Sequence, residues 1–181
     1  AFVMDLDDLA HAALRHGSHD SVFSGIARLF EIVDHLNIGK DLITDSSEKH
    51  QLAELNLKAG KRAKASTAYE AAFLYLQTGV DLLEADSWQQ QYNLTLALYV
   101  EATEAAYLSN DFEQMERLVE IVLEHARTLL DKVKIYEVKI DACKARNKLL
   151  DAVQTGLSAL KLLGVTFPEK PNKFHILRAL L

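Results

Sequence analysis

Two aspartates near the start of the chain, Asp5 and Asp7, have the spacing of a phosphatase signature. They follow apolar residues in the stretch FVMDLDDLAH, residues 2–11. In such enzymes a buried strand presents the first aspartate as nucleophile and the second as acid/base, with Mg²⁺ between them. That chemistry needs a parallel sheet with a lysine and further acids, and the usual threonine after the pair is missing. We favour a helix start, because acids in the first turn interact favourably with the helix dipole.

Other reactive side chains do not form a recognisable site. His11, His16 and His19 could ligate a metal ion, but the spacing of five between His11 and His16 does not place both on one helix face. The single cysteine, Cys143, lies on an apolar helix face without a specified base, so we expect a buried structural thiol. We therefore expect no catalytic residue, no metal and no cofactor, and predict that this chain is not an enzyme.

The basic segment AGKRAKAS, residues 59–66, carries Lys61 and Lys64 beside Gly60. It lacks the second glycine and the GK[ST] ending of a phosphate-binding loop, and it falls inside a predicted helix. The cations suit the C-terminal end of that helix, where the dipole favours positive charge. The other interpretation, a small patch for an anion or an acidic partner, stays open.

Composition and charge narrow the class of protein. The 181 residues carry a net charge of −6, which argues against nucleic acid as a partner. No apolar run reaches the roughly 18–20 residues of a membrane span, so we expect no membrane partner. A single cysteine suits a reducing compartment, and we expect a cytoplasmic location. The apolar ends, AFV and RALL, predict lost contacts with neighbouring segments or self-association into a homodimer.

The secondary structure predicted from the sequence is helical throughout. Only two prolines and seven glycines interrupt a chain rich in strong helix formers, which indicates an all-α fold. Apolar residues at helical spacing predict helices over 3–15, 20–36, 47–64, 68–83, 88–108, 111–129, 131–146 and 149–163. A further helix is expected to begin near Asn172. Three helix starts have a cap residue three positions before an acid or amide: Thr67, Ser87 and Asn110.

The predicted helices form pairs that resemble one another. Tyr69, Phe112 and Leu149, which are 43 and 37 residues apart, each follow a short turn and begin a second helix. Small or slim apolar residues follow three, seven and ten positions later: Ala72, Leu76 and Gly79; Met115, Val119 and Val122; Ala152, Gly156 and Ala159. Such repetition predicts a solenoid, since a single pair cannot bury its apolar stripe alone. Small residues should mark the close contact within one pair: Gly60, Ala63, Ala72 and Gly79.

This pattern resembles the tetratricopeptide (TPR) repeat. Gly60, nine residues before Tyr69, falls at the family's glycine in the first helix, and Ala72 and Ala152 fall at its near-constant alanine. The spacing exceeds the usual 34 residues, and the closing proline is absent from the first two repeats. Where the family has a late aromatic residue in the first helix, this chain has Ala63, Ala106 and Cys143. The resemblance implies antiparallel helix pairs stacked as a TPR-like right-handed superhelix.

The repeat register implies a domain division and a binding face. We expect an N-terminal helical segment of uncertain role over 1–43, TPR-like repeats over 44–168, and a linker or the start of a further helix over 169–181. By the family's geometry, seven residues would face the concave groove: Lys61, Lys64, Glu104, Tyr107, Lys134, Asp141 and Lys144.

A second resemblance covers about residues 26–171. Runs such as RLFEIVDHLNIG, LAELNLKAGKRAKASTAYEAA and LTLALYVEATEAAYLSNDFEQME look like the helical segment of large bacterial signalling proteins common in cyanobacteria. Those proteins combine a serine/threonine kinase, an ATPase, the helical segment, a GAF domain and often a histidine kinase. GVTFPEKP, residues 164–171, is similar to the exit from that segment.

The second resemblance implies a non-catalytic interaction and relay module, whose concave face binds a peptide or an adjacent domain of the parent chain. The alternative is an effector-sensing helical arm of an ATPase-linked transcriptional activator. An effector site needs a dry apolar pocket with few polar anchors, whereas a peptide groove should be wide and charged.

Overall fold

The computed structural model describes residues 19–167, and every regular element in that range is a helix. The elements are α2 (His19–Ile38), the 3₁₀ helix η1 (Lys40–Leu42), α3 (Ser46–Ala65), α4 (Tyr69–Asp81), α5 (Ser87–Gln90), α6 (Tyr92–Leu108), α7 (Phe112–His125), α8 (Leu129–Ala145) and α9 (Leu149–Leu162). The predicted helix over 3–15, the helix expected near Asn172, and Asp5, Asp7, His11 and His16 lie outside the described residues. The all-α prediction is confirmed for the described part of the chain.

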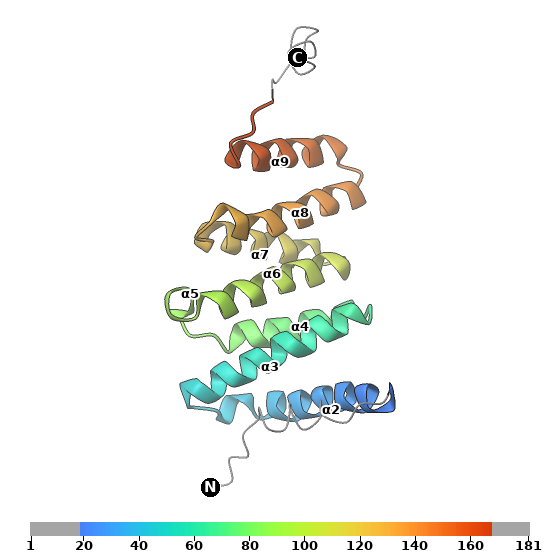
Figure 1. Cartoon of the computed structure of the whole chain (residues 1–181), viewed down its shortest axis with the longest axis vertical. Helices are drawn as coiled ribbons and strands as arrows, with labels where there is room; N and C mark the ends of the chain where they lie inside the picture. Colours follow the sequence, from blue (N-terminus) through green and yellow to red (C-terminus); the bar gives the residue numbers. More distant parts are fainter. Residues whose placement is uncertain (1–18, 168–181) are drawn as a thin grey trace.

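The helices lie across the long axis of the molecule, from α2 at one end to α9 at the other (Figure 1). Consecutive long helices pack on each other, and α6 also contacts both α3 and α8. One core cluster runs through this stack and includes Leu52, Leu76, Leu98, Val122 and Ile135, each at most 2% exposed. The apolar stripes of α3, α4, α6, α7 and α8 are therefore buried between neighbouring helices, whereas α9 buries only Ala152.

The first helix, α2, joins the stack through apolar and polar contacts with α3. Val33 packs with Leu55 and Ala59 in a second, smaller core cluster. Beside it, the amides of Asn37 and Asn56 bond to each other in both directions, at 2.9 and 2.8 Å. Asn56 is fully buried, so this amide pair satisfies polar groups that would otherwise be costly to bury.

Two glycines allow the closest helix contacts. A Cβ atom at Gly60 would lie 2.4 Å from Cγ of Leu76, which confirms Gly60 as a contact point between α3 and α4. A Cβ atom at Gly79 would lie 2.6 Å from Cδ2 of Leu98 and 3.3 Å from Cβ of Asn56. Gly79 therefore lies at a junction of three helices and not only inside one pair, as the sequence suggested.

Three turns between helices share one backbone conformation. Thr67, Asn110 and Asn147 have positive φ angles of 60°, 63° and 57°. The residue after each donates its backbone N–H to a carbonyl five positions earlier, in the pairs Ala68–Ala63, Asp111–Ala106 and Lys148–Cys143. The three residues follow the C-terminal ends of α3, α6 and α8, and they are 43 and 37 residues apart, the same spacing as Tyr69, Phe112 and Leu149. A left-handed residue at this place satisfies carbonyls that the helix end leaves free.

The prediction of N-caps at Thr67, Ser87 and Asn110 is wrong, because Thr67 and Asn110 instead form these left-handed turns. The N-cap of α7 is Asp111, whose carboxylate accepts the backbone N–H of Gln114 at 3.1 Å. Ala68 is the N-cap of α4 and makes no side-chain bond. Ser87 is buried and is the first residue of α5, whose N-cap is Asp86.

The helix predicted over 88–108 is interrupted at Gln91, whose φ and ψ are −131° and 39°. The interruption frees carbonyls that a continuous helix would have used. Arg127 bonds to the carbonyls of Trp88, at 2.7 Å, and Gln89, at 3.4 Å. A residue from the α7–α8 connection therefore stabilises the break between α5 and α6.

The helix predicted over 111–129 ends earlier, at His125, and α8 begins at Leu129. Thr128 and Asp131 form a capping box: the Thr128 hydroxyl accepts from the Asp131 backbone at 3.2 Å, and the Asp131 carboxylate accepts from the Thr128 backbone at 3.1 Å. Asp131 also accepts a 2.6 Å bond from the Tyr92 hydroxyl. The capping box therefore starts α8 at Leu129, two residues before the start of the helix predicted over 131–146.

Candidate functional site

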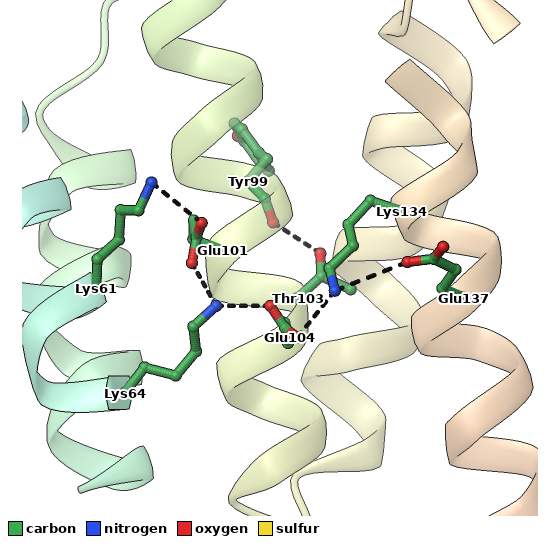
Figure 2. A network of polar contacts seen from close by, with 8 residues as sticks. All are labelled: Lys61, Lys64, Tyr99, Glu101, Thr103, Glu104, Lys134 and Glu137. Atoms are coloured by element: carbon green, nitrogen blue, oxygen red, sulfur yellow. Dashed lines mark hydrogen bonds and ion pairs between the residues drawn. The ribbon is translucent and has the colours of Figure 1, made fainter. Parts of the chain in front are cut away.

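The first helices of the three pairs, α3, α6 and α8, carry a continuous chain of opposite charges, which we call the ionic ladder. Figure 2 shows the ladder crossing from α3 through α6 to α8. It consists of Lys61, Lys64, Glu101, Glu104, Lys134 and Glu137. Within each helix its two members are three residues apart, which places both side chains on one helix face.

Lys64 connects the first pair to the second. Its ammonium group binds the carboxylates of both Glu101 and Glu104, the latter at 2.6 Å. The side chain is 19% exposed. Burial alone would lower the pKa of Lys64, but the bonds to the two glutamates outweigh it and raise that pKa.

Glu104 connects the second pair to the third. Its carboxylate lies 2.6 Å from the Lys64 ammonium and 3.0 Å from that of Lys134. Burial alone would raise the pKa of Glu104, but the bonds from the two lysines outweigh it and lower that pKa. Glu104 is therefore held as a carboxylate that bridges α3 and α8.

The two ends of the ladder are more open to solvent. Lys61 lies 3.5 Å from Glu101 with 56% of its side chain exposed, and Lys134 lies 3.8 Å from Glu137 with 45% exposed. Lys61 and Lys64 thus extend to α6 and pair with its acids. The sequence left two interpretations of these lysines open: charges at the end of a helix, or a patch for an anion. In the structure both lysines are paired with glutamates of α6.

A hollow of about 210 Å³ lies beside the ladder, between α6 and α8. It is lined by Glu104, Tyr107, Lys134, Glu137, Val138, Ile140 and Asp141. Lys144 lies one turn beyond and pairs with Asp141 at 2.9 Å, which raises the pKa of Lys144. The lining of the hollow thus combines an aromatic ring, two aliphatic side chains and charges of both signs.

Of the seven residues predicted to face a groove, four belong to the ladder: Lys61, Lys64, Glu104 and Lys134. Tyr107 and Asp141 join Glu104 and Lys134 in the hollow. Sequence reasoning missed Glu101 and Glu137. The available signal was an acid three residues from a chosen position on the same helix face.

The histidine, cysteine and acidic side chains that the sequence singles out can be followed only in the described part of the chain. Within residues 19–167, no group of three or more His, Cys, Asp or Glu side chains is placed to hold a metal ion. Cys143 is half-buried rather than fully buried as expected. Over the same range, no helix is long and apolar enough to cross a bilayer.

Comparison with known proteins finds a similar region in a much longer signalling protein. The chain is 25% identical over 146 residues to the hybrid signal transduction histidine kinase G of Dictyostelium discoideum. The matched region is 76% of this chain but only 4% of that relative. No protein-family model matches the chain. No solved structure is significantly similar to it.

Proposed function

We propose that this helical segment is a non-catalytic interaction and relay module of a multidomain signal-transduction kinase that acts in the cytoplasm. The stack would be a TPR-like right-handed superhelix, with the ionic ladder and the adjoining hollow on its concave face. That face would bind a peptide segment or a neighbouring domain of the parent chain. The parent would resemble the bacterial proteins that join a kinase, an ATPase, a GAF domain and a histidine kinase.

The observation that carries the proposal is the ladder itself, because it provides one charged surface that spans three helix pairs. Four lysines and four acids lie on or beside it, counting Asp141 and Lys144. A surface of both signs, with Tyr107 beside it, suits a polar peptide better than a purely apolar molecule. The similarity to a histidine kinase of far greater length supports a place inside a large signalling protein.

Relay between neighbouring domains has a physical basis in the same contacts. Solenoids bend by small rotations between adjacent pairs. The bridges of Lys64 and Glu104 cross both junctions between pairs, so a ligand that competes for either group would alter those junctions. Coupling between two sites requires a ligand to make different contacts in the two states of the protein, and competition for Lys64 or Glu104 would provide that difference.

The alternative function, an effector-sensing arm of a transcriptional activator, has less support. The hollow beside the ladder holds about 210 Å³, and a second hollow between α8 and α9 holds about 250 Å³. Sites for small molecules usually enclose about 300–1,000 Å³. Both hollows are smaller, and the one beside the ladder is lined by charges rather than by a dry apolar wall.

The test is site-specific photo-crosslinking in the longest natural chain that contains this segment. A photoreactive phenylalanine analogue replaces Tyr107, and mass spectrometry identifies the crosslinked peptides. We expect crosslinks to one peptide or domain surface, and we expect them to disappear when Glu104→Lys reverses the charge beside the probe.

The matched control carries the same analogue at Glu120, an exposed residue of α7. Equal crosslink yields and identical peptides from the two positions would rule out the ladder face as a specific binding surface. A thermal shift with a metabolite library, suppressed by Glu104→Lys, would favour the effector-sensing alternative instead.

A further inference from the structure

The groove between α8 and α9 is an apolar surface that the described residues do not fill. It contains the hollow of about 250 Å³, lined mainly by apolar side chains of the two helices, including Val133, Ile140, Ala159 and Leu160. At its rim Leu129, Leu162 and Leu163 are 43–47% exposed. This groove lies at the α9 end of the stack, beyond which Figure 1 shows no further helix among the described residues.

The corresponding groove between α3 and α4 is filled by the first helix of the next pair. There, α6 packs against both α3 and α4. Leu98 of α6 enters at Gly79, where a Cβ atom would lie 2.6 Å from its Cδ2. Gly79 is ten residues after Tyr69, and Ala159 is ten residues after Leu149, so Ala159 occupies the equivalent place in the open groove.

The equivalent of Leu98 can be found by the same register. Leu98 lies fourteen residues before Phe112, and Ile135 lies fourteen residues before Leu149. Both are fully buried. One further period of 37 to 43 residues beyond Ile135 falls on 172–178, within the sequence NKFHILRALL. That stretch supplies Phe174, Ile176 and Leu177 as large apolar residues.

We propose that residues 172–181 dock into the groove between α8 and α9 as the first helix of the next pair, with an apolar residue of 174–177 inserted at Ala159. Nine residues separate Leu162, the end of α9, from residue 172, and ten residues, which include α5, join α4 to α6. Apolar residues at 174, 177 and 181 share one face of a helix, and this is the face that would meet the groove. Burying such a face against the groove would remove the exposed apolar side chains of α9 from water.

The first test is disulfide formation in the full chain with Cys143→Ala as background. Ala159→Cys is combined in turn with Phe174→Cys, Ile176→Cys and Leu177→Cys. We expect at least one combination to form an intramolecular disulfide roughly tenfold faster than its control, because docking raises the effective concentration of the two thiols. The matched control moves the first cysteine by one residue to Ser158→Cys, on the exposed side of α9.

Equal rates from positions 158 and 159 would overturn the proposal. Disulfides that form only between two molecules, seen as dimers on a non-reducing gel, would also overturn it and would assign the groove to a second copy of the chain.

A second measurement keeps the native cysteine and needs no crosslink. Hydrogen exchange of the α9 amides is compared in the full chain, in Leu177→Asp and in His175→Asp. We expect Leu177→Asp to speed α9 exchange by about tenfold, since a charge cannot stay in an apolar groove, and His175→Asp to leave it nearly unchanged. Unchanged exchange in both variants would show that the segment does not cover α9. The proposal is independent of the ladder's function.

Discussion

Gly60 of α3 packs directly against Leu76 of α4, so closely that a Cβ atom at position 60 would lie 2.4 Å from Leu76 Cγ and 2.8 Å from its Cδ2. Leu76 is fully buried, and Cγ is not the free end of a flexible chain. The helices α3 and α4 can therefore pack this closely only because position 60 has no side chain.

Gly60→Ala should lower the free energy of unfolding by about 1–3 kcal/mol, because overpacking forces side-chain or backbone shifts in a dense core. The matched control is Gly156→Ala in α9, where the new Cβ would meet only Ile140 Cδ1 at 3.7 Å. That change should raise stability by about 0.5–1 kcal/mol, since alanine is the better helix former. Urea unfolding followed by circular dichroism measures both; the same sign at both positions would contradict the packing argument.

Asn56→Ala should destabilise the protein by about 1–3 kcal/mol, because it leaves the amide of Asn37 without its reciprocal partner at the α2–α3 contact. Asn93→Ala on exposed α6 surface is the control and should change stability by less than about 0.5 kcal/mol. Adding Asn37→Ala to Asn56→Ala should cost less than the sum of the two single changes. Strict additivity would mean that the amide pair does not contribute to stability.

Glu104→Gln should cost about 1 kcal/mol at neutral pH, because it removes the charge that Lys64 and Lys134 share on a partly exposed surface. The pKa of Glu104 is lowered in the fold, so its stabilising contribution is present above the unfolded value of 4.5 and is lost as the pH falls further. The stability difference between wild type and variant should therefore shrink on acidification below that value. Denaturant unfolding at a series of pH values measures it, with Glu120→Gln on exposed α7 as the control. A difference that is constant with pH would contradict the bridging role.

Thr67→Gly should raise stability by about 0.5–1 kcal/mol, because the left-handed φ of 60° is costly for a β-branched residue and free for glycine. The same substitution at Thr128 should have the opposite sign, since Thr128 has a φ of −122° and its hydroxyl caps α8. Thermal melts of the two variants provide the comparison. Destabilisation by Thr67→Gly would show that the threonine side chain has a role other than occupying the turn.

The helices themselves could be predicted from apolar spacing, and most of their bounds agree to within two residues. Where boundaries were missed, a contact distant in sequence decides them: Arg127 accommodates the break at Gln91, and Tyr92 reinforces the cap at Asp131. The left-handed turn at Thr67 was misread as a cap because threonine is common at caps and rare at positive φ. The domain boundary at 43/44, the concave-groove position of the seven residues and the identity of the partners remain predictions.

The sequence by itself determined that the described chain is helical, where its apolar stripes lie and where small residues permit close contact, because these depend on local propensity and on spacing within one helix. Only the tertiary structure decided which charges meet. Lys64 and Glu104 are 40 residues apart, and nothing in either local sequence specifies the other. Their pairing follows from the angle and register at which α6 packs on α3, and these are set by side chains such as Leu98 meeting Gly79 in the core.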